Sequence, residues 1–247
     1  MSRFDLPNRF HDDTPVEDFR RIEGGVPHCF IVGLDIGKLR DHTALVVNEV
    51  LACENVFYQR TKFQPEAVAV RRERIFRHSL VNLHRYELGL SYPEIYSSVK
   101  GIMDQLPKRA GAKNSLICDQ TGVGGPVVDG LRHIGLRPIG VTITGGTTVT
   151  HVDARTINVP KSVLASSLEA VLTQDRLDVA DDASASQQFK HELGAFSVKI
   201  RASGTEAFEA ERERDHDDLV MAAALAVWYA ENLPTPTQFT NIPRVRI

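Results

Sequence analysis

Carboxylates occupy three places in this sequence where an unpaired charge is costly. Asp35 and Asp119 each end an apolar run, and Asp217 with Asp218 opens the apolar run 219–230. Burying a charge at the end of a core strand or at the start of a core helix is penalised heavily, and a bound divalent cation offsets that penalty. Hard oxygen ligands select Mg²⁺ or Mn²⁺. Two such ions held about 3.5–4 Å apart are the machinery of phosphodiester hydrolysis.

Each of these carboxylates also has a structural interpretation. An Asp after a strand often caps a turn, and Asp is a preferred residue at a helix N-terminus. The pattern 217, 221, 224, 228 forms one stripe along the last apolar helix, which places Asp217 at the top of a helix packed on a sheet. We therefore favour Asp217 as the third ligand and keep Asp218 as the second choice.

Four further residues are candidates for binding phosphate. Lys161 follows Pro160 at a predicted helix start, where a cation is unfavourable unless it faces an anion. His216 precedes the carboxylate pair and is a candidate ligand or phosphate contact. Gly122 and Gly124 lie in the turn after Asp119, where backbone N–H groups can bind phosphate at a helix N-terminus. The alternatives are an ordinary surface lysine, a structural histidine and a tight strand–helix connection.

The arginines of segment 71–77 form the densest basic run. They are candidates for a DNA-contacting patch, although such a run is usually a solvated helix face. Segment 65–77 has the composition of a helix.

The elements that must position these residues follow from hydrophobic periodicity. Strands are predicted at 29–34, 43–51, 79–88, 115–119 and 137–144, with short strands at 177–180 and 196–200, and residues 55–63 extend a hairpin. Helices are predicted at 92–106, 126–134, 160–174, 184–193 and 217–231. Strands followed by alternating helices and strands indicate a mixed α/β sheet with helices on its faces.

The chain of 247 residues divides into an arm or linker at 1–26, one α/β domain at 27–233 and a tail at 234–247. Proline, glycine and polar residues break any periodicity in the first segment. Its lack of an apolar stretch argues against a signal peptide. The apolar run 219–230 is too short to cross a bilayer, which needs about 20 residues. We therefore expect a soluble, intracellular protein.

The net charge limits how the chain could bind DNA, and the cysteine pattern argues against a disulfide framework or a zinc site. The formal net charge is −3, so DNA binding requires a local basic patch or bridging metal ions. The three cysteines form neither a disulfide framework nor a CxxC zinc pattern, and they are predicted to be small core residues.

Five segments together resemble the nuclease domain of the large terminase subunit of tailed bacteriophages. They occur in the order of that family, at 33–45, 118–129, 140–146, 159–161 and 216–222. The resemblance implies an RNase H-like mixed sheet flanked by helices, as in the retroviral-integrase superfamily. It also implies a metal-dependent endonuclease that cuts double-stranded concatemeric viral DNA during genome packaging.

In that family the first strand, the fourth strand and the final helix supply the acidic ligands. The matching positions here are Asp35, Asp119 and Asp217 or Asp218. The resemblance implies that they hold two Mg²⁺ or Mn²⁺ ions, with Asp35 bridging both. Lys161 and His216 would then stabilise charge on the scissile phosphate.

The implied partners are double-stranded DNA, the terminase ATPase domain, the small terminase subunit and the portal. The implied location is the cytoplasm of an infected bacterial host, with the chain encoded by a virus or a prophage. One departure is clear, because the sequence has no Walker A motif. The chain is therefore predicted to be an excised domain or a separately encoded nuclease that does not translocate DNA alone.

Three other interpretations remain open. Leu34-Asp35-Ile36-Gly37 also fits the first loop of actin-like or sugar-kinase ATP-binding proteins, although no second copy of the loop is evident. A junction-resolving nuclease of the same superfamily would use similar carboxylates on branched DNA. A catalytically idle binding module would use them only as caps.

Overall fold

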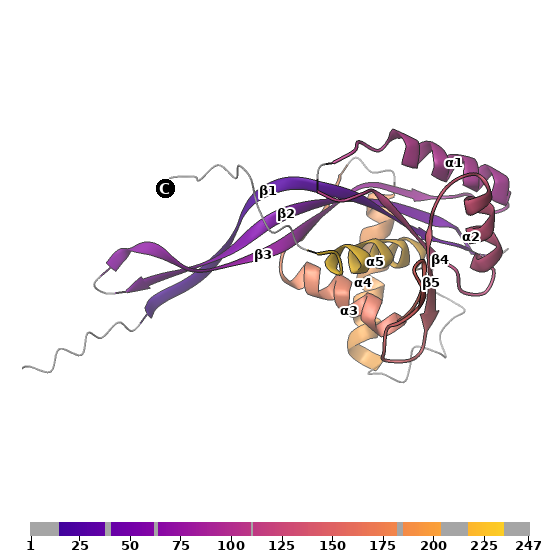
Figure 1. The fold of residues 1–247 in the computed structure, drawn as a ribbon. Helices are drawn as coiled ribbons and strands as arrows, with labels where there is room; N and C mark the ends of the chain where they lie inside the picture. The colour runs from indigo at the N-terminus through magenta and orange to yellow at the C-terminus, as the bar shows by residue number, and fades with distance from the viewer. Residues whose placement is uncertain are drawn as a thin grey trace, which may run out of the picture.

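The chain forms one eight-stranded mixed sheet with helices on both faces (Figure 1). The computed structural model describes residues 15–37, 41–61, 64–109, 111–181, 185–203 and 217–234. The strand order is β6-β7-β5-β4-β1-β2-β3-β8, so the first strand lies near the middle of the sheet. The expectation of an α/β fold is confirmed, and the architecture is consistent with an RNase H-like fold.

The first three strands are long and antiparallel. They are β1 (Pro15–Asp35), β2 (Ala44–Thr61) and β3 (Gln64–Arg85). Their β-branched residues suit a sheet that is covered on both faces over residues 28–35 and 44–52. Beyond that covered part, the three strands continue together as a narrow extension that projects away from the helices (Figure 1).

The other half of the sheet is largely parallel. β4 (Ser115–Asp119) lies beside β1, β5 (Ile139–Thr144) beside β4, and β7 (Thr156–Pro160) beside β5, all in parallel. The edge strand β6 (Thr150–Asp153) is antiparallel to β7, and the short β8 (Leu177–Val179) runs parallel to β3. The carboxyl ends of four parallel strands therefore meet at one edge, where ligands bind in open α/β sheets.

Helices cover the two faces unequally. α1 (Tyr92–Gln105) and α2 (Gly124–His133) pack on one face over Val32, Leu34 and Cys118. α3 (Lys161–Thr173), α4 (Ser186–Ser203) and α5 (Asp218–Glu231) cover the other face. α5 is the central helix, because its side chains from 219 to 228 are all buried. Among the described residues, no helix has the length and apolarity needed to cross a membrane.

Two local predictions were wrong. Segment 65–77, predicted from its composition to be helical, lies in β3. Segment 196–200, predicted to be a strand, lies in α4. The strands β6 and β7, which flank the turn at residues 154–155, were not predicted. The helix that follows them was predicted. For β3, β6 and β7, pairing with neighbouring strands, which the local sequence does not encode, decides the conformation.

The predicted division of the chain also changes at its first boundary. Residues 15–26, assigned to an arm without periodicity, are the first half of β1 and pair with β2. Residues 1–14 and most of the predicted tail, 235–247, lie outside the described residues.

Candidate metal centre

Asp35 and Asp119 lie side by side at the ends of neighbouring parallel strands. The register pairs Leu34 with Cys118, so the next residue of each strand is one of the two aspartates. Side chains alternate between the faces of a strand. Leu34 and Cys118 point into the core beneath α1 and α2, and the two carboxylates therefore lie on the opposite face, under α5.

Gly33 brings the last helix close to this pair. A Cβ on Gly33 would overlap the carbonyl oxygen of Ala222, so the backbone of α5 rests directly on β1. This close approach sets the N-terminus of α5 over the ends of β1 and β4. Asp217 and Asp218 lie at that N-terminus, as predicted.

The two aspartates of α5 have different surroundings. Asp217 is the N-cap residue but its side chain makes no capping hydrogen bond, and about a third of the side chain is exposed. Its Oδ2 accepts a hydrogen bond from Lys161 Nζ at 2.9 Å. Asp218 is 8% exposed, and its Oδ2 accepts a hydrogen bond from Arg85 at 3.3 Å. Asp217 is thus the accessible member of the pair, and Asp218 is the buried one.

Lys161 reaches the carboxylates because it begins α3 immediately after β7. Pro160, the last residue of β7, pairs with Thr144 at the same sheet edge as Asp119. The sequence predicted that Lys161 faces an anion, and the anion that it contacts is the carboxylate of Asp217. Phosphate binding by Lys161 stays a prediction.

The electrostatics of the cluster are dominated by like charge. Burial and, after it, the charges of Asp119, Asp218 and Asp217 raise the pKa of Asp35 well above its usual value, and Lys161 opposes this rise. Burial also raises the pKa of Asp119, although hydrogen bonds from Thr121 and Asp35 and the charge of Lys161 lower it in part. Four carboxylates around one spot therefore leave negative charge that a cation would neutralise.

The turn after β4 holds Asp119 in place. The backbone N–H of Thr121 donates to Asp119 Oδ1 at 2.8 Å, and the Thr121 hydroxyl accepts from Ile143 N at 2.8 Å. Gly122 has φ +64°, and a Cβ on Gly124 would overlap the backbone of Asp119. Both glycines thus have structural reasons to be glycine, and phosphate binding at this turn stays a prediction.

Two polar residues near the cluster were missed by sequence reasoning. Arg85, the last residue of β3, pairs with Asp218. Glu192 of α4 is 3% exposed and accepts a hydrogen bond from the backbone N–H of Leu219 at 3.1 Å. Burial raises the pKa of Glu192, and the charge of Asp218 adds to that rise. Neither contact leaves a local signal, because the partners are 133 and 27 residues apart.

The donor chemistry of the cluster fits a hard divalent cation. Its side chains offer carboxylate oxygens alone, the ligands that Mg²⁺ and Mn²⁺ prefer. Within the described part of the chain, however, no three His, Cys, Asp or Glu side chains are already arranged to hold a metal ion. Lys161 and Arg85 each engage one of the carboxylates. His216 lies outside the described residues.

Comparison of the chain with protein-family models, with curated proteins and with solved structures found no match.

Proposed function

We propose that this protein is a divalent-metal-dependent endonuclease that hydrolyses double-stranded DNA, of the terminase nuclease type. One observation carries the proposal: Asp35, Asp119 and Asp217 converge at the carboxyl edge of the sheet from two parallel strands and the central helix. Burial and, after it, the neighbouring carboxylates raise the pKa of Asp35, and this supports a cation at this place.

Asp35, Asp119 and Asp217 would hold two Mg²⁺ or Mn²⁺ ions. Asp218, which pairs with Arg85, is a fourth carboxylate nearby. The metal would supply Lewis-acid activation of water and of the scissile phosphate. The hydrogen bond from Thr121 orients Asp119 toward the cluster. If Asp217 held a metal, Lys161 would be free to neutralise charge on the phosphate.

The experiment is cleavage of supercoiled plasmid with Mg²⁺, with Mn²⁺ and with EDTA. We expect nicking and linearisation with either metal and none with EDTA. Asp35→Asn removes the central ligand while keeping the side-chain shape, and it should abolish cleavage. Asp129→Asn is the matched control, because Asp129 is an exposed carboxylate on α2. Equal cutting by the wild type and by Asp35→Asn would refute the proposal.

Two alternatives are tested in the same preparation. ATP binding without DNA would favour the actin-like interpretation, and preference for a four-way junction over linear duplex would favour a resolving nuclease.

We further propose that the protein works in viral genome packaging in a bacterial host, with an ATPase domain, a small terminase subunit and a portal as partners. Cleavage coupled to such an ATPase in reconstituted packaging would test this assignment.

A further inference from the structure

The projecting extension is built from residues 15–26 of β1, 52–61 of β2 and 64–77 of β3. Along these segments the three strands pair with one another, and the pairing with β4 and β8 begins only at Ile31 and His78. Ten residues of β2 span about 30 Å at the rise of a strand. Figure 1 shows the extension pointing away from all five helices. Phe76 and Ala52, at the base of the extension, belong to the core, whereas most side chains at 18–26 and 66–74 are exposed or partly exposed. The outer strands of the extension therefore offer a surface for binding.

Two rows of side chains cross the extension with arginine on both outer strands. Arg20, Phe57 and Arg71 are directly opposite one another and form one row. Arg21, Val56 and Arg72 form the next row, which lies on the other face because neighbouring residues alternate. Each row therefore places the backbones of two arginines about 10 Å apart across two strand spacings.

Aromatic rings order these arginines. The guanidinium of Arg71 lies 4.9 Å from the ring centre of Phe57, and that of Arg21 lies 5.3 Å from the ring of Phe19. Phe19 in turn stacks on Tyr58 with ring centres 5.3 Å apart. Cation–π contacts hold guanidinium planes in place while leaving N–H groups at their edges. The entropy lost when such a group binds an anion is then smaller.

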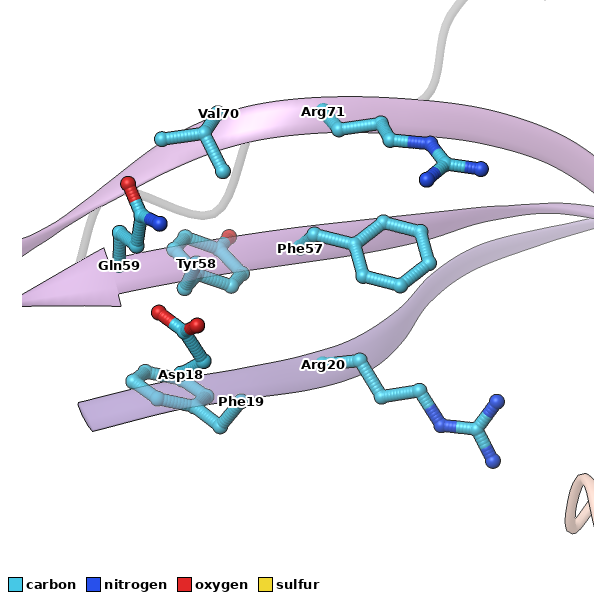
Figure 2. A pocket seen from close by; sticks show the side chains of 8 residues that line it. All are labelled: Asp18, Phe19, Arg20, Phe57, Tyr58, Gln59, Val70 and Arg71. Atoms are coloured by element: carbon cyan, nitrogen blue, oxygen red, sulfur yellow. The ribbon is translucent and has the colours of Figure 1, made fainter. Parts of the chain in front are cut away.

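Figure 2 shows the hollow beside the first row, with Phe57 between Arg20 and Arg71. Val70, which is 55% exposed, lies at its rim. One N–H of Arg20 bonds the Gln174 carbonyl at 3.4 Å, which leaves its other donors for a ligand.

The charge of the extension is opposite to that of the whole chain. Its three segments, 15–26, 52–61 and 64–77, contain seven arginines and six acidic residues. The whole chain has 29 basic and 32 acidic residues. Three of the extension's acids are bonded within it: Glu23 to Tyr58, Glu54 to Arg72 and Glu73 to Arg71. A phosphate would therefore share Arg71 and Arg72 with these carboxylates. Arginine on both outer strands of a projecting surface fits the phosphate backbone of a duplex.

We propose that the extension binds the phosphate backbone of duplex DNA as a second contact, separate from the carboxylate cluster. The choice of DNA as partner rests on the proposed nuclease function. Arg20 and Asp35 are 15 residues apart on β1, which is at most about 50 Å. At 3.4 Å per base pair, a duplex of about 15 base pairs spans that distance. The extension would thus retain DNA while the distant edge of the sheet acts on it.

The test measures binding of a fluorescent 30-base-pair duplex by anisotropy in EDTA, where no cleavage occurs, over a series of salt concentrations. The double variant Arg20→Gln/Arg71→Gln should bind about tenfold more weakly at low salt. The slope of log affinity against log salt should become shallower by about 1.8, as expected for two lost phosphate contacts. Lys100→Gln/Arg132→Gln, which removes the same charge from exposed positions on α1 and α2, should bind like the wild type.

A second variant changes the charge in the other direction. Asp18→Gln/Glu66→Gln removes two exposed acids from the extension and should tighten binding. This result does not depend on whether the arginine variant folds. No binding by the wild type at low salt, or equal weakening by the extension variant and the α1/α2 variant, would overturn the proposal. Asp35→Asn should bind as the wild type does or more tightly, so loss of cleavage and loss of this contact are separable.

Discussion

Asp35 is held in an environment that favours its neutral form. Burial and three neighbouring carboxylates raise its pKa, and Lys161 compensates only in part. Removing the charge should therefore relieve repulsion in the metal-free protein. We expect Asp35→Asn to raise the melting temperature in EDTA by about 2–4 °C, which corresponds to about 1 kcal/mol. Differential scanning calorimetry at pH 7 measures it. A lower melting temperature would mean that Asp35 is a structural cap.

Lys161 forms an ion pair with Asp217, the carboxylate proposed as a metal ligand. Its Nζ is 2.9 Å from Asp217 Oδ2, so a metal ligand at Asp217 has to compete with this ion pair. We expect Lys161→Met to lower stability in EDTA by up to about 1 kcal/mol, since both side chains are partly exposed. It should also increase the rise in melting temperature that Mn²⁺ causes, because tighter binding stabilises the folded state further.

The control for that comparison is Lys100→Met. Lys100 makes an ion pair of 3.0 Å with Asp104 on α1, far from the carboxylate cluster. Its loss should leave the Mn²⁺ response unchanged. An equal response to Mn²⁺ in all three proteins would show that Lys161 does not compete with metal.

The sequence identified the carboxylates because each follows or begins an apolar run. Asp35, Asp119 and Asp217 carry a local signal of this kind, and the structure brings them to one edge of the sheet. Arg85 and Glu192 carry none, because a polar residue at a strand end or on a helix looks ordinary until its distant partner is known. Long-range pairing is therefore the part of the site that local patterns omit.

At the scale of elements, β3 shows where periodicity fails. Segment 65–77 has the composition of a helix, yet residues 68, 69 and 71–77 pair with β2, with irregularities at 65–67 and 70. Its side chains are largely exposed, so no buried face imposes a period of two. By contrast, α1 and α3 were predicted within about two residues of their ends, because each buries a clear apolar stripe.

The contact between β1 and α5 depends on one glycine. A Cβ on Gly33 would overlap the Ala222 carbonyl and crowd Ala226. Gly33→Ala must push α5 away from the sheet, and we expect it to destabilise the fold by about 2–3 kcal/mol. Gly101→Ala is the control, because Gly101 lies inside α1 with open space around it, and it should stabilise by about 0.5–1 kcal/mol.

Urea unfolding measures both variants. The displacement of α5 would also move Asp217 away from Asp35, so Gly33→Ala should lose cleavage even at temperatures where it is folded. Equal stability of the two variants would mean that α5 does not pack as closely on β1 as the structure indicates.

At the scale of the whole molecule, one polar network joins parts that are distant in the sequence. Glu231, at the end of α5, accepts hydrogen bonds from His78 of β3 at 2.9 Å and from Arg176, before β8, at 2.8 Å. Arg176 also donates to the Phe76 carbonyl at 2.6 Å. The network fastens the C-terminal end of α5 to β3 and to the residue before β8, whereas Asp217 lies at the other end of the helix.

This network predicts how stability depends on pH. Burial alone would raise the pKa of Glu231, but the hydrogen bonds from His78 and Arg176 lower it to about 2. Burial lowers the pKa of His78, although Glu231 opposes that shift. A carboxylate with a lowered pKa stabilises the fold above its unfolded value near 4.5, and that contribution is lost as the pH falls toward 2. The unfolded state also protonates His78 more readily below pH 6.5.

Both groups therefore make the protein less stable as the pH falls from 7 to 3. We expect Glu231 to account for about 2–3 kcal/mol of that loss. Glu231→Gln should lower stability at pH 7 and flatten the pH dependence between 5 and 3, because the titrating group is gone. Asp104→Asn, which removes an exposed carboxylate from α1, should leave the profile unchanged. Parallel urea-unfolding profiles for the wild type and Glu231→Gln across this range would show that Glu231 does not couple α5 to the sheet.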